Sequence, residues 1–517
     1  MTRRIGFFLG LAAFVVILTI PPIASFQEIS TQRVEETRLL VEPETLAASM
    51  QSVLAVLALM VIWWITEAVP LPATSLLPAV LFPLLRVVGV HGDSLFEFTP
   101  RNALINYAHP VIFLFLGGFL LAGAMQKWKL DRRFTLWLLT RGTIANDTRK
   151  VLFAMMSATT LLSMWISNTA TAAMMLPLGL GILALMKLEP GKTGYGTAMM
   201  LGIAWSASIG GVATIIGSPT NGVALGILNA RYAGEPAYQQ ISFLDWMKIG
   251  IPYVILFLPV AWFLLVKMFP SAETSIPRGK QGLLAEQKSL GPLSTGEKRT
   301  IFVFGLAVLL WVTNPFWDSL LPSRLATQLS WLDEYAIGLL CGALLFFVPI
   351  RFRKSEFVLD WHDASFVDWG TLLLFGGGIA LSDGMFKSGL AHWIATNFVG
   401  MVGSPLPLVM LLLIIFLVNF LTEITSNTAV VSMLVPVLLS IAETTGSNPV
   451  MYAVTAAVSA SMAFMLPVAT PPNALVFSKG FIKIGDMVRA GFLLNLVGWF
   501  LTVAIVGGIG WRLLEMF

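Results

Sequence analysis

Two apolar stretches of the chain are interrupted in their middle by the same tripeptide, and this feature restricts the possible fold more than any other. Between Val151 and Leu188, and again between Pro405 and Ile441, a Ser-Asn-Thr sequence divides an apolar run, and a proline follows ten residues after the serine. Neither part of a divided run is long enough to cross a bilayer, which takes roughly 20 apolar residues. Non-helical backbone at membrane depth is tolerated only where it lines a cavity or is buried in protein. We therefore predict two re-entrant hairpins.

The composition supports a membrane environment for these hairpins. Of 517 residues, 56% are hydrophobic and 12% are charged, which is more apolar sequence than one globular core buries. The single cysteine, Cys341, lies in an apolar run and excludes a disulfide framework. The first apolar run is interpreted as a membrane span rather than a cleaved signal peptide. We predict spans near residues 5–24, 51–66, 70–90, 110–126, 197–229, 248–270, 301–314, 335–350, 370–386, 450–480 and 487–513.

The distribution of basic residues predicts the orientation. With the N-terminus in the cytoplasm, 23 of the 32 Lys and Arg residues fall in cytoplasmic loops or at the N-terminus, as the positive-inside rule requires. The acidic segment from Phe26 to Glu44 then lies outside, and an odd number of spans leaves the C-terminus outside. We predict a multi-pass protein of the plasma (inner) membrane. Basic residues confined to short loops do not indicate nucleic-acid binding.

The interrupted runs belong to a longer internal duplication. Four anchors recur in one order at offsets of 260, 259 and 252 residues, which indicates a repeat rather than chance. The pairs are Gly117-Gly118 with Gly377-Gly378, Lys127 with Lys387, Ser167-Asn168-Thr169 with Ser426-Asn427-Thr428, and residues 217–221 with 469–473. Because five crossings separate the halves, corresponding elements face opposite sides. Inverted repeats with interrupted helices are typical of secondary transporters, whose site lies where the breaks meet.

These observations predict an all-α polytopic membrane protein, an inverted repeat with about 11 transmembrane helices, two re-entrant hairpins and two broken helices. Residues 1–50 form the first transmembrane helix and the acidic outer segment, and residues 271–300 form a cytoplasmic linker. The first repeat spans 51–270, with an inward-opening hairpin at 148–188. The second spans 301–517, with an outward-opening hairpin at 405–445.

The residues around both tripeptides suit an anion and a cation together. Helices that begin within the membrane direct unpaired N–H groups and the positive end of the helix dipole at the gap, whereas side-chain and carbonyl oxygens suit a small hard cation. No Lys, Arg or His occurs from Ser157 to Met186 or from Asn427 to Leu439, so a bound anion must be balanced by backbone dipoles and cations. The nearest ionisable residue, Glu423, has Met164 as its counterpart. A structural role behind the tip is favoured for Glu423 over cation binding.

From about residue 50 the chain resembles the divalent anion/sodium symporter family, through the sequence WWITEAVPLPATSLLP, the paired tripeptides and the GSPTN and ATPPN breaks. The resemblance implies sodium-driven uptake of C4-dicarboxylates such as succinate by a homodimer, in which a transport domain moves as an elevator. It implies substrate contacts from Ser167, Asn168, Thr169, Ser218, Pro219, Ser426, Asn427, Thr428, Thr470 and Pro471. It also implies one sodium ion among Ser163, Asn168 and Gly217, and a second among Thr422, Thr425, Asn427 and Ala469. Thr220 departs from the family, which often has proline there, as the second repeat has in Pro472.

Other functions were weighed against this one. An enzyme would need a nucleophile or a base, and the site windows contain no His, no Cys and no paired carboxylates. A channel would normally build its filter as a symmetric ring from several subunits. A sodium-independent dicarboxylate exchanger, and a sodium-coupled citrate or sulfate transporter, stay open as alternatives.

Overall fold

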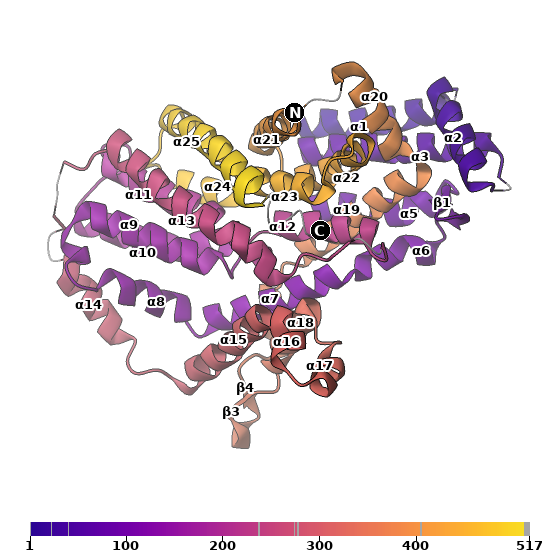
Figure 1. Ribbon diagram of the computed structural model, residues 1–517. Helices are drawn as coiled ribbons and strands as arrows, with labels where there is room; N and C mark the ends of the chain where they lie inside the picture. The colour runs from indigo at the N-terminus through magenta and orange to yellow at the C-terminus, as the bar shows by residue number, and fades with distance from the viewer. Residues whose placement is uncertain are drawn as a thin grey trace.

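The computed structural model describes residues 2–21, 23–39, 41–235, 238–272, 275–276, 279–403 and 406–510. Most of this part of the chain is helical (Figure 1). The strands form two short antiparallel hairpins, β1 with β2 and β3 with β4. The predicted helical membrane fold is confirmed, and the two hairpins are an addition that the sequence analysis did not predict.

The first half runs as far as the long helix α13. Its elements are α1 (Thr2–Thr19), α2 (Ala24–Thr37), α3 (Pro43–Thr66), α4 (Leu71–Thr74), α5 (Leu77–Leu84), β1 (Val88–His91), β2 (Ser94–Glu97), α6 (Pro100–Leu104), η1 (Ile105–Ala108), α7 (Pro110–Lys127), α8 (Leu130–Leu139), η2 (Ile144–Asn146), α9 (Thr148–Ser163), α10 (Asn168–Leu185), α11 (Gly194–Gly211), η3 (Ile215–Gly217), α12 (Pro219–Tyr232) and α13 (Phe243–Met268).

The second half follows the linker helix α14 (Gly279–Ser289). Its elements are α15 (Thr295–Thr313), η4 (Asn314–Phe316), α16 (Trp317–Leu320), α17 (Ser323–Leu329), α18 (Glu334–Leu344), β3 (Pro349–Arg351), η5 (Phe352–Lys354), β4 (Glu356–Phe357), η6 (Trp361–Phe366), α19 (Trp369–Ser388), α20 (Leu390–Val402), α21 (Pro407–Ile424), α22 (Asn427–Thr445), α23 (Pro449–Ala460), α24 (Pro471–Phe477), α25 (Ile484–Ala504) and η7 (Ile505–Gly510).

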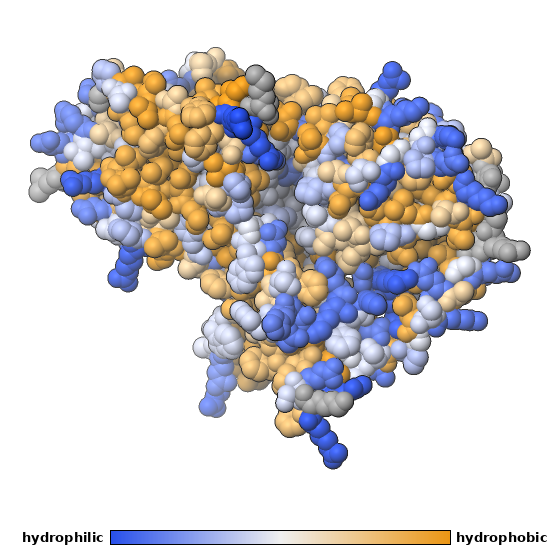
Figure 2. Space-filling model, turned by 180° about the vertical axis from the view of Figure 1, so that it is seen from behind, coloured by the Kyte–Doolittle hydropathy of each residue, from blue (hydrophilic) through white to orange (hydrophobic). Residues whose placement is uncertain are grey.

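Within the described residues, eight helices are long and apolar enough to cross a membrane, or up to nine if the bent pair α1 and α2 counts as one span. Three of the eight, α10, α21 and α22, are parts of the divided runs, so the expectation that neither part is long enough to cross is wrong for these helices by length and composition. Helices at three predicted spans are shorter: Leu71–Leu84, Glu334–Leu344 and Pro449–Ala460. The surface agrees with a lipid environment, because apolar residues cover broad areas of the face seen in Figure 2 and hydrophilic side chains project at its margins. The chain is a multi-pass membrane protein.

All four predicted helix interruptions are present. The first tripeptide separates α9 from α10 and the second separates α21 from α22. The third break, between α11 and α12, holds the one-turn helix η3, and the fourth separates α23 from α24. Pro219 and Pro471 stand at the first positions of α12 and α24. Proline is tolerated there because the N–H groups of the first helical turn have no partner within the helix.

Glycine residues allow close backbone contacts between the two halves. Gly117 of α7 lies against the backbone of Gly338 in α18, where a Cβ on Gly117 would collide with the Gly338 carbonyl. Gly377 of α19, the sequence counterpart of Gly117, lies equally close to the carbonyl of Ser75, directly after α4. Each half therefore contributes a helix that is packed against the backbone of the other half.

Matching turns follow these two helices. Lys129, between α7 and α8, has φ 55°, and Gly389, between α19 and α20, has φ 96°. The two positions are 260 residues apart, which is the offset of the duplication at the preceding lysines. Both residues have left-handed backbone conformations, which glycine adopts readily and lysine adopts with strain. The duplication thus extends to backbone geometry at a position where the residue type differs.

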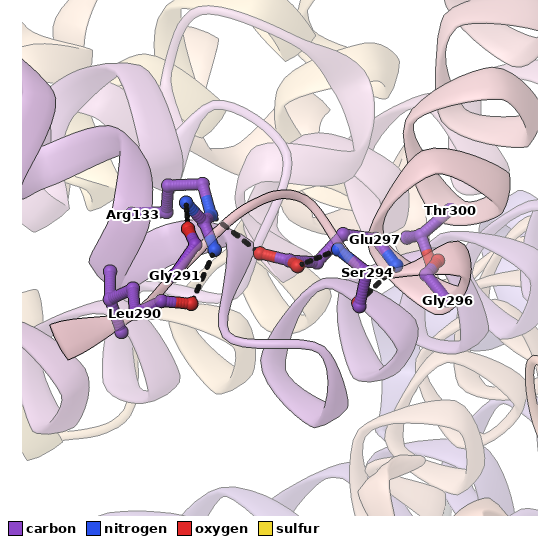
Figure 3. Close-up of polar contacts among 7 residues, drawn as sticks. All are labelled: Arg133, Leu290, Gly291, Ser294, Gly296, Glu297 and Thr300. Carbon is purple, nitrogen blue, oxygen red and sulfur yellow. Dashed lines mark hydrogen bonds and ion pairs between the residues drawn. The ribbon is translucent and has the colours of Figure 1, made fainter. Parts of the chain in front are cut away.

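Arg133 on α8 holds the C-terminal end of the predicted linker against the first half (Figure 3). Arg133 on α8 donates from Nε to Glu297 Oε1 at 2.5 Å, and its two terminal nitrogens donate to the carbonyl oxygens of Gly291 and Leu290. Ser294 and Glu297 form a capping box at the start of α15. Arg133 therefore holds the point at which the chain enters its second half.

Most of the acidic segment lies in α2, which packs along α3 and reaches α19 and α20. Arg33 Nη1 donates to the carbonyl oxygen of Lys387 at 3.1 Å, near the C-terminal end of α19. Trp393 of α20 donates to Ser25 Oγ at 2.8 Å. A cation is favourable at the C-terminal end of a helix dipole. This segment therefore braces the end of α19 and the short helix that follows it.

Candidate functional site

The first tripeptide begins α10 with a polar cap. Ser167 is the N-cap residue, and its hydroxyl accepts a hydrogen bond from the Ala170 amide at 3.4 Å. Ser163, at the end of α9, donates to the carbonyl oxygen of Ala207 in α11 at 2.7 Å. The same hydroxyl lies 2.8 Å from the side-chain amide of Asn168. The tip of the first hairpin is thus tied to the first part of the broken helix α11–α12.

The amide of Asn168 is surrounded by oxygen atoms. With its nitrogen turned toward them, Asn168 donates to Ser163 Oγ at 2.8 Å, to Ala207 O at 2.9 Å and to Gly217 O at 3.2 Å. With its oxygen turned toward them instead, Asn168 Oδ1 faces Ser163 Oγ and the carbonyl oxygens of Ala207 and Gly217. No proton then lies between the amide oxygen and the two carbonyl oxygens. Four oxygens grouped in this way suit a hard cation. Ser163, Asn168 and Gly217, predicted to share a sodium ion, lie together. The sequence reasoning missed the carbonyl of Ala207.

The second tripeptide repeats part of this cluster. Thr422 Oγ1 lies against Asn427 Oδ1 and 2.9 Å from the carbonyl oxygen of Ala460. These three residues correspond to Ser163, Asn168 and Ala207 at offsets of 259, 259 and 253 residues. The residue types and the contacts therefore match in both halves.

Two other residues predicted for the second sodium site have different partners. Thr425 Oγ1 donates to the carbonyl oxygen of Trp64 in α3 at 3.2 Å. The Ala469 amide donates to the carbonyl oxygen of Leu466 at 3.2 Å, within the break itself. In the described part of the chain, no hydrogen bond joins Thr425 or Ala469 to Asn427. The structure therefore brings only part of the predicted second sodium set into hydrogen-bond contact.

An asparagine closes each broken helix. Asn221 Nδ2 donates to the carbonyl oxygens of Gly211 and Thr214 at 2.9 and 2.8 Å. In the second half, Asn473 Nδ2 donates to the carbonyl oxygens of Ala463 and Leu466 at 2.9 and 3.1 Å. Both asparagines are fully buried. They were not predicted as site residues, although each is the last residue of a repeated segment, 217–221 or 469–473.

Glu423 has the structural role that the sequence analysis favoured. Its carboxylate accepts hydrogen bonds from the backbone amides of residues 464, 465 and 466 at 2.8 to 3.1 Å, and from Asn495 Nδ2 at 2.8 Å. The residue is 3% exposed. The non-helical backbone between α23 and α24 is therefore held by a carboxylate. In the first half the carbonyl of Met164 accepts from the Thr214 hydroxyl instead.

The remaining predicted substrate residues lie at the starts of four helices. Ser218 and Thr470 are the N-cap residues of α12 and α24. The hairpin helix α10 packs against α24, and α12 packs against the hairpin helix α22, so each tripeptide helix meets the broken helix of the other half. Thr169 and Pro471 are exposed, whereas Thr428 is buried. Among the described residues, no hydrogen bond connects the two tripeptides directly.

The fold and this pair of matched clusters define a helical membrane transporter, and the sequence relatives give the family. Residues 35–517 match the family described as the sodium:sulfate symporter transmembrane region. The chain belongs to this family. The family membership that the sequence resemblance implied is thereby confirmed.

Relatives with described activities cover almost the whole chain. A sodium-dependent dicarboxylate transporter, SdcS, of Staphylococcus saprophyticus is 38% identical over 483 residues, which are 91% of this chain and 88% of the relative. The transporter of the same name from Staphylococcus aureus strain USA300 is 37% identical over 479 residues, with the same coverage.

Two solved structures share the fold. The YdaH transporter of Alcanivorax borkumensis aligns with a TM-score of 0.54 at 17% identity, over 86% of this chain and 98% of that one. MtrF of Neisseria gonorrhoeae, from a class of antimetabolite efflux pumps, aligns with a TM-score of 0.55 at 13% identity, over 86% and 96% of the two chains. At this identity the likeness concerns the fold alone.

Proposed function

We propose that the protein is a secondary active transporter that couples the uptake of a divalent anion to sodium, with C4-dicarboxylates such as succinate as the favoured substrates. The observation that carries this proposal is the repeated cluster of an asparagine amide, a hydroxyl and an alanine carbonyl at the two hairpin tips. Uncharged oxygens of this kind suit sodium. The family match and the sodium-dependent dicarboxylate transporters among the relatives support the same function.

We assign the dianion to the helix starts that surround these clusters. The windows around both tripeptides contain no Lys, Arg or His, so helix dipoles, unpaired N–H groups and sodium must balance the two negative charges. This arrangement makes anion binding depend on the cation. It also favours transport over catalysis, because the same windows contain no His, no Cys and no paired carboxylates that could act as a base or activate a hydroxyl.

For alternating access we propose an elevator in an inverted-repeat homodimer of the plasma membrane. The first hairpin opens to the cytoplasm and the second to the outside, with the N-terminus in the cytoplasm and the C-terminus outside. The moving unit comprises the two hairpins and the two broken helices, together with α13 and α25. In support, helices of the two hairpins pack against the broken helices of the opposite half.

Transport into proteoliposomes tests the proposed function. An inward sodium gradient should drive uptake of labelled succinate, and a potassium–valinomycin potential, negative inside, should accelerate it. Acceleration is expected if three sodium ions accompany each dianion, because one net charge is worth about 2.3 kcal/mol per 100 mV. Citrate and sulfate serve as competing substrates. Uptake that ignores sodium and voltage but requires internal dicarboxylate would instead establish the exchanger.

A further inference from the structure

Thr220, which stands where the second half has Pro472, lies at the centre of a buried cluster of hydroxyl groups. Its Oγ1 is 2.8 Å from Ser218 Oγ, 3.3 Å from Asn221 Oδ1 and 3.3 Å from Ser461 Oγ at the end of α23. All four residues are at most 2% exposed. Thr220 thus joins a predicted substrate ligand of the first half to a helix of the second half.

The amide of Asn221 fixes the direction of the protons in this cluster. Both Asn221 hydrogen bonds to Gly211 and Thr214 come from Nδ2, so Oδ1 faces Thr220 as an acceptor. In the hydrogen bond that joins Thr220 to Asn221 at 3.3 Å, Thr220 is the donor, and this bond uses the only proton of its hydroxyl. Ser218 must then donate its own proton to Thr220. The hydroxyl of Ser218 keeps only lone pairs for a ligand.

The corresponding hydroxyl in the second half, that of Thr470, has the opposite hydrogen-bonding role toward a ligand. Pro472 replaces threonine there and supplies no hydroxyl, and Asn473 Oδ1 is buried without a partner in the described part of the chain. The hydroxyl of Thr470, the counterpart of Ser218, accepts from the Asn473 amide at 3.3 Å. No acceptor for its proton occurs among the described residues. Thr470 can therefore donate to a carboxylate, whereas Ser218 can only accept.

We propose that Thr220 is a specificity-determining residue that makes Ser218 an acceptor toward the substrate. This inference rests on the proposed function, in which Ser218 and Thr470 contact the dianion. A donor at one break and an acceptor at the other match a C4-dicarboxylate that carries a hydrogen-bond donor on its carbon chain, such as a 2-hydroxy acid. An unsubstituted dicarboxylate offers Ser218 no proton. The first half therefore selects 2-hydroxy dicarboxylates over unsubstituted ones.

Competition uptake with the full-length protein in proteoliposomes tests this inference. Labelled succinate uptake is inhibited with L-malate or with unlabelled succinate in wild type, Thr220→Val, Thr220→Pro and Thr220→Ser. Wild type should prefer malate. Thr220→Val and Thr220→Pro, which reproduces the second half, should reduce the ratio of malate to succinate affinity about three- to tenfold, the range for one hydrogen bond. Thr220→Ser keeps the hydroxyl and should keep the wild-type ratio.

Three outcomes would overturn the inference. Equal changes in the affinities for malate and succinate, or no change in either, would show that Thr220 does not set the polarity of Ser218. A shift confined to the sodium concentration for half-maximal uptake would place the lone pairs of Ser218 on the cation. The variant Ser218→Ala distinguishes a failure of this inference from a failure of the proposed substrate site. If the affinities for malate and for succinate both stay unchanged in Ser218→Ala, Ser218 does not contact the substrate at all.

Discussion

Asn168 and Asn427 each combine a donor and an acceptor in one uncharged group. Rotation of the amide changes which atom faces the neighbouring carbonyls, with no change in charge. A carboxylate in the same place would repel the dianion, and a lysine would attract it without sodium. An amide therefore fits a site in which the anion is held only when a cation is present.

Gly211 is predicted to be essential for the first cluster because a Cβ there would collide with the Asn168 amide. Gly211→Ala should raise the sodium concentration for half-maximal succinate uptake at least about tenfold, which corresponds to 1.4 kcal/mol. Gly181→Ala is the control, since a Cβ at Gly181 meets nothing within 4 Å. A wild-type sodium dependence in Gly211→Ala would contradict the assignment of this cluster to sodium.

Glu423 is predicted to stabilise the fold rather than to bind an ion. Glu423→Gln leaves one oxygen where the carboxylate accepts from three backbone amides and Asn495, and each buried donor left unpaired costs about 1–3 kcal/mol. The midpoint of thermal unfolding, followed by tryptophan fluorescence, should fall by several degrees. Glu443→Gln should change it less, because the Glu443 side chain is 33% exposed. Equal midpoints for the two variants would refute the structural role.

At the scale of elements, the helix breaks were predictable and the contacts that hold them were not. A Ser-Asn-Thr sequence in an apolar run identifies a helix start by its capping chemistry, which is local. The closure of the breaks by Asn221 and Asn473 depends on carbonyls that the chain brings near only after it folds. For the same reason the sequence reasoning missed Ala207, whose backbone carries the contact and whose side chain gives no signal.

Segment length was the weaker part of the prediction. The predicted span at 335–350 corresponds to the 11-residue helix α18, and the strands β3 and β4 follow in a region of loop composition. Hydropathy measures how apolar a segment is, and a short helix buried among other helices has the same composition as one that crosses lipid. Tertiary packing therefore determines these lengths.

The linker is predicted to depend on Arg133 more than on its neighbour Arg132. Arg133→Lys keeps the charge but loses the planar group that reaches Glu297 and two backbone carbonyls. Among the described residues Arg132 pairs only with Glu286, and its side chain is 44% exposed, so Arg132→Lys should have little effect. Thermal unfolding midpoints measure the difference, and limited proteolysis should cut the linker faster in Arg133→Lys. Equal behaviour of both variants would contradict the anchoring role.

At the scale of the whole molecule, the proposed topology predicts opposite labelling of two positions. Ser289 ends the linker helix α14 and Gln32 lies on α2, and both residues are exposed at well-separated parts of the structure (Figure 1). In a Cys341→Ser background, Ser289→Cys should react with an impermeant maleimide only from the cytoplasmic side, and Gln32→Cys only from the outside. Labelling of both from one side would break the inverted-repeat topology.

The glycine contacts between the halves join segments that are far apart in the chain. Gly117 has no side chain to cover its backbone, and its partner Gly338 lies 221 residues later. A nascent chain that stops before α18 therefore presents a bare strip of α7 to the lipid or to the insertion machinery. A product truncated before α18 therefore lacks the backbone contact that Gly117 makes in the folded protein.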